Sequence, residues 1–292
     1  MILVAGATGN VGGELVRALA AAGEPVRALT RGQAPQAPRT SQVSASAFSA
    51  RGTFPPRVET VTGDLNDPDS MRDALTGATG MFLLSGYQNM PGTLAQANRA
   101  GVRHIVLLSG SSAGSGDMSN AISRYMIESE TAVRESGLAW TILRPFGFMS
   151  NALQWVPQLR GGDVVRAPWA TVRVAVIDPY DIAAVAALAL TSGGHEDQCY
   201  TLSGPEPMLP GERVRVLGEV LGRDLRFEGQ PDDEARAEMS KAMPARYVEA
   251  FFSFYGDGTL DESRALPTVR DVTGRPPRTF RRWAREHAGA FR

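Results

Sequence analysis

Three glycines near the start of the chain have the spacing of a phosphate-binding turn. Gly6, Gly9 and Gly12 recur every third residue after an apolar run over residues 1–5, and from Val11 onward apolar residues recur at helical spacing. This order predicts a buried strand, a glycine turn and a helix. The free N–H groups and dipole of a helix start favour an anion at such a turn. We therefore expect a dinucleotide pyrophosphate here, against the alternative of a glycine-rich turn without a ligand.

The residue that ends the second predicted strand bears on the choice of dinucleotide. This strand covers residues 25–30 and is followed by Arg31, and no Asp or Glu occurs between Ala28 and Arg57. In a dinucleotide fold, an acidic residue at this place accepts from the 2′-hydroxyl of NAD, whereas an arginine suits the 2′-phosphate of NADP. The sequence favours NADPH, with a solvated arginine at a strand end as the alternative. Residues 32–57 are predicted to form a long surface loop.

Further short apolar strands alternate with helical segments along the first half of the chain. The predicted strands cover residues 58–61, 81–84, 104–108 and 140–143. This alternation predicts an α/β fold with a Rossmann-type, doubly wound parallel sheet. Ligands of such sheets bind at the carboxyl ends of the strands, where Asp64, Ser85, Ser109 and Pro145 fall. We expect Asp64 to accept from the adenine amino group and Ser85 to lie beside the nicotinamide ribose.

The second half of the chain is expected to build the substrate side. We divide the chain into a dinucleotide-binding domain, residues 1–150, and a smaller C-terminal α/β region, residues 151–292, that is partly interleaved with the sheet. Strands are predicted at 172–177, 199–202 and 225–228, the second of which can join the main sheet. In a predicted helix at 150–159, Trp155 is either a wall for a flat substrate or a core residue. Asp178 and Asp181 fit an N-cap and the first turn of a helix.

Composition limits the environment and the partners. The formal net charge of −1 argues against bulk attraction to nucleic acid or to an anionic membrane. The single cysteine, Cys199, cannot form an internal disulfide, and the longest apolar run, 182–190, is too short to span a bilayer. The three histidines show no metal-ligand spacing. We expect a cytoplasmic protein with no metal, no membrane contact and no nucleic-acid partner, although the last helix is rich in arginine. Composition leaves the oligomeric state open.

Several blocks of sequence together resemble the NmrA-like family of atypical short-chain dehydrogenases, which includes NAD(P)H:quinone oxidoreductases and redox-sensing regulators. The blocks are Gly6-Ala-Thr-Gly-Asn-Val-Gly12, Gly63-Asp-Leu65, His104-Ile-Val-Leu-Leu-Ser109, Glu128-Ser-Glu130, residues 136–145, Phe148-Met-Ser-Asn151, residues 178–184 and residues 273–280. The resemblance implies that the pyrophosphate is held by Gly6, Thr8, Gly9, Asn10, Val11 and Gly12. It also implies that Arg31 meets the 2′-phosphate, that Asp64 and Leu65 meet the adenine, and that Leu84 and Ser85 meet the ribose near the nicotinamide. The nicotinamide and substrate side would be lined by Phe146, Phe148 and Met149, next to Pro145.

Tyr125 is the candidate catalytic residue, but the sequence departs from the motif in which such a tyrosine usually stands. Short-chain dehydrogenases typically use Tyr-x-x-x-Lys, in which the lysine lowers the pKa of the proton-donating tyrosine. Here Ser129 stands four residues after Tyr125, and the only lysine of the chain is Lys241. Tyr125 also shares a predicted apolar face with Ile122 and Met126, so a packed core tyrosine is the alternative. Alcohol and ketone chemistry with a tyrosine acid is therefore disfavoured.

Three functions remain open. The first is an NADPH-dependent oxidoreductase that transfers hydride to a quinone or a similar flat carbonyl acceptor, for which solvent can supply the protons. The second is a non-catalytic NADP(H)-sensing protein that acts through a protein partner, as the missing lysine would favour. The third is a tailoring ketoreductase, in which Tyr125 or a serine near Ser111 would have to assist.

Overall fold

The computed structural model describes residues 1–30 and 54–292, and its centre is a parallel sheet of seven strands. The strand order is β3-β2-β1-β4-β5-β6-β8, so the direction of winding reverses beside β1. Arg31 and most of the predicted loop at 32–57 lie outside the described residues. The strands are β1 (Ile2–Val4), β2 (Val26–Thr30), β3 (Glu59–Thr62), β4 (Gly80–Leu84), β5 (His104–Leu108), β6 (Ala139–Pro145) and β8 (Gln198–Leu202). The predicted α/β fold with a doubly wound parallel sheet is confirmed.

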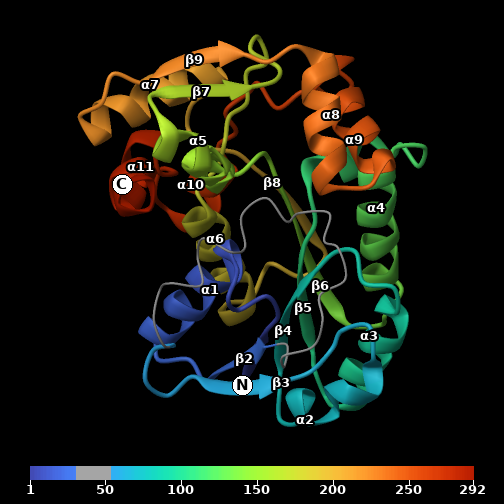
Figure 1. Cartoon of the computed structure of the whole chain (residues 1–292). Helices are drawn as coiled ribbons and strands as arrows, with labels where there is room; N and C mark the ends of the chain where they lie inside the picture. The colour runs from blue at the N-terminus through green and yellow to red at the C-terminus, as the bar shows by residue number, and fades with distance from the viewer. Residues whose placement is uncertain (31–53) are drawn as a thin grey trace.

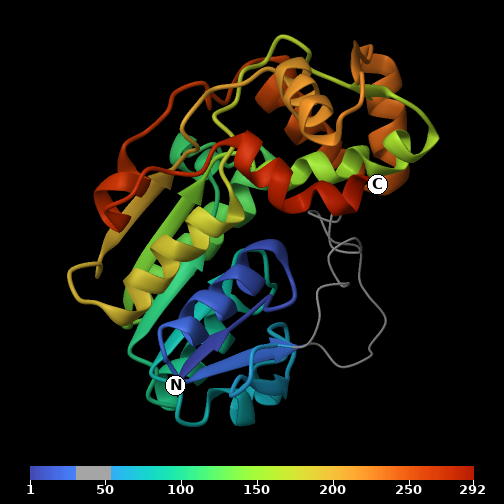
Figure 2. The ribbon, with the colours of Figure 1, turned by 90° about the vertical axis from the view of Figure 1, so that its left-hand side faces the viewer.

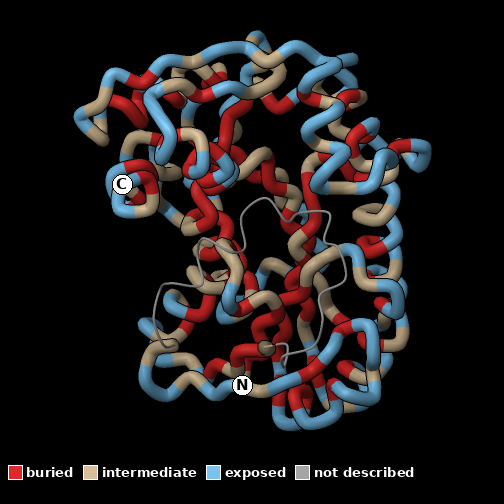
Figure 3. Tube along the Cα trace, viewed as in Figure 1, coloured by how far each residue is buried: buried red, intermediate tan, exposed pale blue. Residues whose placement is uncertain are grey.

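Helices cover both faces of the sheet (Figure 1). One face carries α1 (Asn10–Ala21), α6 (Pro179–Thr191) and α10 (Thr268–Thr273), and the other carries α2 (Arg72–Leu75), α3 (Met90–Arg99) and α4 (Ala121–Arg134), with the short η1 (Pro68–Met71). Alternate strand residues pack into the two layers, as Val106 and its neighbour Leu107 do in β5. The buried parts of the chain therefore run along the strands and the helix faces turned to them (Figure 3).

A smaller region lies at one end of the large sheet (Figures 1 and 2). It contains a two-stranded parallel sheet of β7 (Val164–Ala167) and β9 (Arg226–Gly229). Its helices are α5 (Val156–Gly161), α7 (Pro210–Leu221), α8 (Asp232–Ala242), α9 (Ala245–Phe251) and α11 (Phe280–His287). Short 3-10 helices also occur at η2 (Ser111–Ser115), η3 (Met149–Trp155) and η5 (Ala288–Phe291), and η4 (Phe252–Gly256) is π-helical. Residues after 150 thus build this region and also supply α6, β8 and α10 to the large sheet and its layers.

One strand prediction for the second half is wrong. The predicted strand at 172–177 belongs to neither sheet; it forms isolated bridges, between Val174 and Met208 and between Ile177 and Phe148. The segment is extended, but its backbone bonds go to loops, including one from the Ala175 N–H to the Glu262 carbonyl at 2.8 Å. The predicted helix at 150–159 is observed as the 3-10 helix η3 followed by α5. The expectation that a strand near 199–202 joins the main sheet is confirmed by the pairing of β8 with β6.

Candidate active site

The glycine turn between β1 and α1 is tightly packed against its own backbone. Gly6 has a φ of +63°, which favours glycine, and a Cβ on Gly12 would lie 2.2 Å from the Gly6 carbonyl oxygen. A Cβ on Gly9 would lie 3.2 Å from the same oxygen. Gly9 is the N-cap of α1, and no side chain caps the helix. The turn therefore leaves helix N–H groups for a ligand and keeps side chains out of their way, which fits a dinucleotide pyrophosphate.

The other predicted turn residues have different surroundings. Thr8 is exposed, whereas the Val11 side chain is 4% exposed and packs in the core, so only its backbone faces the turn side of α1. The Asn10 amide donates to the Ser150 hydroxyl at 3.0 Å, although these residues are 140 positions apart. Ser150 lies in η3, just after β6. This bond joins the start of α1 to the chain that leaves the carboxyl end of β6.

The predicted adenosine contacts follow β3 and the predicted ribose contacts lie at the end of β4, and β2 and β1 lie between these two strands in the sheet. Leu84 lies against Gly6, with its Cδ1 2.8 Å from where a Gly6 Cβ would be. The Ser85 hydroxyl donates to the Leu108 carbonyl at 3.0 Å and so ties the end of β4 to β5. Asp64 is exposed and accepts from the Asn66 N–H at 2.9 Å. Leu65 is 4% exposed, and its side chain packs in the core between the sheet and the layer that contains α2 and α3. Its backbone is therefore the part available to a ligand.

The residues that follow β6 divide into a half-buried and a buried group. Phe148 is half-buried against the α1 layer, and Phe146 is 6% exposed next to the buried Pro145. Met149 and Trp155 are 1% and 2% exposed, in the core of the smaller region. These two side chains have no open surface for a substrate. For Trp155 the structure corrects the expected substrate wall, because core packing takes up the whole ring.

Tyr125 lies beside the carboxyl end of β4, on α4. Its ring is half-buried, and a Cβ on Gly86 would lie 3.2 Å from the ring atom Cδ2 of Tyr125. The Tyr125 ring meets the Tyr247 ring edge-on, with 6.5 Å between the ring centroids. Ser129, in the position of the missing lysine, donates its hydroxyl to the Tyr125 carbonyl at 2.7 Å and accepts from the Gly86 N–H at 3.0 Å. This serine connects α4 to the loop after β4 and supplies no positive charge to Tyr125.

A buried carboxylate on α4 fixes the ends of β5 and β6. Glu130 is 1% exposed, and Arg144 on β6 binds it through two nitrogens, at 2.8 and 2.6 Å. Ser109, just past β5, donates to Glu130 at 2.7 Å, and Arg134 donates at 3.1 Å. Burial raises the pKa of Glu130, but the hydrogen bonds of Arg144 and Ser109 and the two arginine charges outweigh it and hold the pKa below its ordinary value. Glu130 is thus a charged structural group.

A second buried carboxylate belongs to a segment that the sequence analysis did not single out. Glu262 is 4% exposed, accepts from the Ser111 hydroxyl at 2.5 Å and from the Gly147 N–H at 3.2 Å, and is also bound by the Tyr255 hydroxyl at 3.2 Å. Residues 257–267 form no helix or strand, and the contact spans 151 positions. No periodicity marks such a residue in the sequence.

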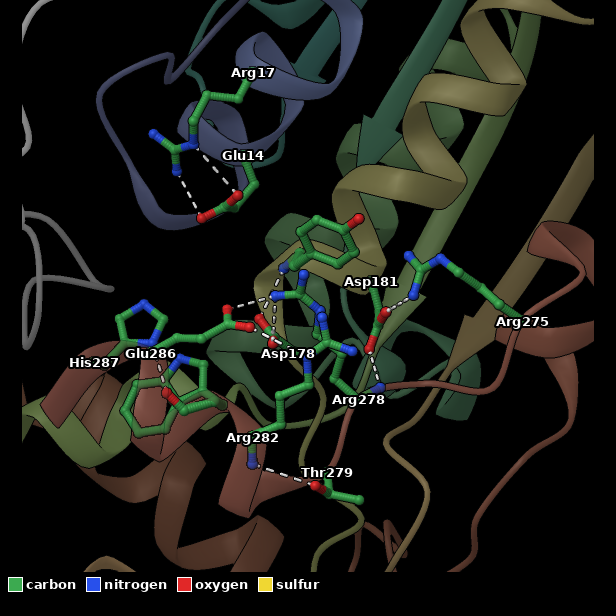
Figure 4. A network of polar contacts seen from close by, with 12 residues as sticks. Glu14, Arg17, Asp178, Asp181, Arg275, Arg278, Thr279, Arg282, Glu286 and His287 are labelled. Atoms are coloured by element: carbon green, nitrogen blue, oxygen red, sulfur yellow. Dashed lines mark hydrogen bonds and ion pairs between the residues drawn. The ribbon is translucent and has the colours of Figure 1, made fainter. Parts of the chain in front are cut away.

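The aspartates at the start of α6 form a further cluster (Figure 4). Asp178 accepts from the Tyr180 N–H at 2.9 Å, which confirms its predicted role as N-cap. Asp181 is fully buried and accepts from the Arg275 guanidinium at 2.9 Å and from the Arg278 N–H at 2.6 Å. The arginine-rich end of the chain is therefore partly used internally, to hold the C-terminal segment against α6.

Comparison with known proteins places this site in a family. The model of the NmrA-like family matches residues 1–270. The chain belongs to the NmrA-like family. The resemblance noted in the sequence is confirmed.

Two curated relatives cover the whole chain. A (4-alkanoyl-5-oxo-2,5-dihydrofuran-3-yl)methyl phosphate reductase of Streptomyces griseus is 42% identical over 295 residues, which is 100% of this chain and 99% of the relative. An NAD(P)H azoreductase of Xenophilus azovorans is 36% identical over 298 residues, again 100% of this chain and 99% of the relative. Both are reductases, which confirms the predicted oxidoreductase class and enzymatic character of the chain.

A solved structure supports the fold. The NADPH-dependent quinone oxidoreductase of Escherichia coli, in complex with NADPH, superposes with a TM-score of 0.75 at 21% identity and covers 99% of this chain and 100% of its own. The expectation of a nicotinamide cofactor agrees with the name of the azoreductase and with this complex. Among the described residues, no helix has the length and apolar character needed to cross a membrane.

Proposed function

We propose that the protein is an NADPH-dependent reductase that transfers hydride to a flat, conjugated acceptor, a quinone or a similar carbonyl compound. The observation that carries this proposal is the glycine turn, with its close Gly12–Gly6 packing and its uncapped α1. Bound NADPH supplies the hydride. The chain's own part is to hold the pyrophosphate at Gly6–Gly12, to bring the strand ends at Leu84 and Ser85 to the ribose, and to place Phe146 and Phe148 on the nicotinamide side.

The relatives support a conjugated acceptor rather than one particular compound. The name of the Streptomyces griseus reductase describes an unsaturated lactone, and the name of the Xenophilus azovorans enzyme implies an azo group. The Escherichia coli enzyme is named as a quinone oxidoreductase. These acceptors share an electron-poor double bond that can take a hydride and then a proton. Because Ser129 stands where a lysine would activate Tyr125, an isolated ketone is a weaker candidate.

Arg31 is our candidate for the preference for NADPH over NADH. It follows β2, outside the described residues, and no acidic residue occurs between Ala28 and Arg57. A guanidinium at this place can bind the 2′-phosphate in a bidentate fashion. With its single cysteine and its nicotinamide chemistry, the enzyme is proposed to work in the reducing cytoplasm.

A non-catalytic NADP(H) sensor is the second candidate, and the observation in its favour is that Ser129, and not a lysine, stands four residues after Tyr125. The two functions differ in turnover, so one experiment separates them. NADPH oxidation is followed with menadione, methyl red, 3-acetyl-2(5H)-furanone and acetophenone, with NADH in parallel and an Arg31→Ala variant beside the wild type. We expect turnover of a conjugated acceptor with a preference for NADPH that the variant loses. Tight NADPH binding without turnover of any acceptor would favour the sensor, and no binding of either nucleotide would contradict both.

A further inference from the structure

Glu262 is held where the loops after β5 and β6 meet. Ser111, which starts η2 shortly after β5, donates its hydroxyl to Glu262 Oε1 at 2.5 Å. Gly147, two residues after β6, donates its N–H to Oε2 at 3.2 Å. Both loops leave the carboxyl edge of the sheet, which is the edge where dinucleotide folds bind cofactor and substrate. The carboxyl group thus lies next to the side proposed for the nicotinamide.

The segment around Glu262 is held by backbone bonds at Glu262 itself and at Leu266. The Ala175 N–H donates to the Glu262 carbonyl at 2.8 Å, and the Leu266 N–H donates to the Ser203 hydroxyl, just past β8, at 2.7 Å. A Cβ on Gly147 would lie 3.6 Å from Glu262 Oε2, so this loop packs directly on the carboxyl group. The position of Glu262 therefore depends on structure far from it in sequence.

The Ser111–Glu262 pair differs from the neighbouring Ser109–Glu130 pair in one respect. Both serines follow β5, and each donates to a buried glutamate. Glu130 also binds the guanidinium groups of Arg144 and Arg134, whereas the groups that bind the Glu262 side chain in the described structure are two hydroxyls and one backbone N–H. Glu130 has the cations that keep a buried carboxylate charged, and Glu262 does not.

We propose that Glu262 supplies the proton that completes reduction of the substrate and that it acts through the Ser111 hydroxyl. Ser111 is half-buried and would contact the substrate, so Ser111 is the catalytic residue of the pair and Glu262 the positioning and proton-supplying one. The inference rests on the proposed reductase function, because a protein without turnover needs no such proton.

The proton and electron balance is simple. Hydride addition forms a bond to one atom of the acceptor's double bond, breaks the π bond and leaves the electron pair on the other atom or on a conjugated oxygen. In the acid form of Glu262 the carboxylic O–H donates to Ser111 Oγ, and the Ser111 O–H turns from Glu262 to the substrate. The Ser111 O–H bond then breaks and its proton bonds to that anion, while Ser111 Oγ takes the proton of the Glu262 carboxylic acid. The resulting carboxylate is stabilised by the Gly147 N–H and the Tyr255 hydroxyl. Water reprotonates Glu262 before the next turnover.

The charges around Glu262 are compatible with an acid form. Burial and the nearby charge of Asp261 raise the pKa of Glu262, and the hydrogen bonds from Ser111, Gly147 and Tyr255 reduce this rise without cancelling it. Burial also raises the pKa of Tyr255 well above its ordinary value, so Tyr255 stays a neutral donor. Arg213 on α7 interacts with Tyr255, and burial lowers the pKa of Arg213 to about 10.

The test compares pH profiles of kcat with methyl red as the acceptor, since its reduced nitrogen needs a proton. The wild type should lose kcat as pH rises through the pKa of Glu262, because the acid form disappears. Glu262→Gln and Ser111→Ala should lower kcat roughly ten- to a hundredfold and abolish that pH-dependent fall. Ser111→Thr, which keeps a hydroxyl, should recover most of the rate, and NADPH affinity should stay within about twofold in all three.

Two further measurements separate proton supply from a structural role. Carbon NMR of ¹³C-labelled glutamate side chains, without cofactor, should show one resonance that titrates at unusually high pH and is absent in Glu262→Gln. Ser109→Ala removes the matching hydroxyl of the Glu130 pair and should keep the wild-type pH profile.

The following results would contradict the proposal. The same fall of kcat with pH in Glu262→Gln, or an NMR signal of Glu262 that is ionised throughout, would overturn the inference and leave the reductase function intact. A wild type that turns over none of the acceptors would overturn the proposed function and this inference with it. If Glu262→Gln does not fold, Ser111→Ala and Ser111→Thr decide, because an equal loss of rate in both would show that the hydroxyl is not the proton path.

Discussion

Gly12 packs directly onto the backbone of Gly6, so that a Cβ on Gly12 would lie 2.2 Å from the Gly6 carbonyl oxygen and 2.6 Å from its carbonyl carbon. Real Cβ atoms do not approach backbone this closely, and the turn would have to open. The next glycine along, Gly13, is different, because its Cβ would lie 3.4 Å from the Ala7 carbonyl oxygen. The two neighbouring glycines of α1 therefore offer a matched test of the turn.

Gly12→Ala should weaken NADPH binding by at least about tenfold, whereas Gly13→Ala should bind within about twofold of the wild type. The first substitution displaces the turn that presents the helix N–H groups, and the second adds a good helix former without a clash. Titration of NADPH fluorescence measures both. Equal affinities for the two variants would argue that the pyrophosphate is not held at this turn.

Glu130→Gln should lower the free energy of unfolding by about 3–5 kcal/mol. The glutamine keeps the shape of the side chain but leaves Arg144, whose guanidinium makes two hydrogen bonds with Glu130, without its counter-charge. Urea denaturation measures the loss. The control is Glu14→Gln on α1, which removes a partly exposed ion pair with Arg17 and should cost less than about 1 kcal/mol. A similar small cost for both variants would mean that the Glu130 network does not stabilise the fold.

The sequence was informative wherever one segment determines its own structure. The strand predicted at residues 104–108 has the observed bounds of β5, because an uninterrupted apolar run specifies a strand buried on both faces. The glycine turn was predicted for a similar reason, since Gly6 and Gly12 meet within a few residues of each other. The parallel sheet followed from the alternation of such segments.

The predictions that failed concern residues whose structure depends on partners far away in the sequence. Residues 172–177 are as apolar as a strand, but their backbone bonds go to loops such as that of Glu262, and no local pattern shows this. Trp155 was ambiguous because an aromatic side chain on a helix suits a core and a substrate wall equally well, and only its 2% exposure decides. Glu262 was missed because its partner Ser111 is 151 positions away.

The contribution of Asp178 to the free energy of unfolding should fall as pH rises from about 4 to about 7. Burial raises the pKa of Asp178 from 3.8 to about 6, against the hydrogen bond from the Tyr180 N–H, with a further rise from Asp181. The folded state therefore holds a proton that the unfolded state has already lost. The stability due to this proton is fully present below the unfolded pKa and is lost as pH rises through about 6. Two pKa units correspond to roughly 3 kcal/mol.

Asp178→Asn tests this, because asparagine is an equally good N-cap for α6 but does not titrate. The difference in unfolding free energy between variant and wild type should move in favour of the variant by roughly 2–3 kcal/mol between acid and neutral pH. Asp67→Asn makes the same substitution at an N-cap aspartate that lies on the surface, at η1, and controls for the change of side chain itself. Parallel curves for Asp178→Asn and the wild type would show that folding does not raise the pKa of the Asp178 carboxyl.

Tyr125→Phe should keep kcat with methyl red or menadione within about threefold of the wild type. The tyrosine lacks the lysine that would lower its pKa, and the residue in that place, Ser129, is engaged with the Tyr125 carbonyl and the Gly86 N–H. Phenylalanine keeps the edge-on ring contact with Tyr247, so the packing of α4 on α9 should survive, which a thermal melt can verify. Ser111→Ala is the comparison, because the proton is proposed to pass through that hydroxyl. A loss of a hundredfold or more in Tyr125→Phe, at unchanged stability and NADPH affinity, would instead make Tyr125 the proton donor and leave Ser111 and Glu262 as structural neighbours.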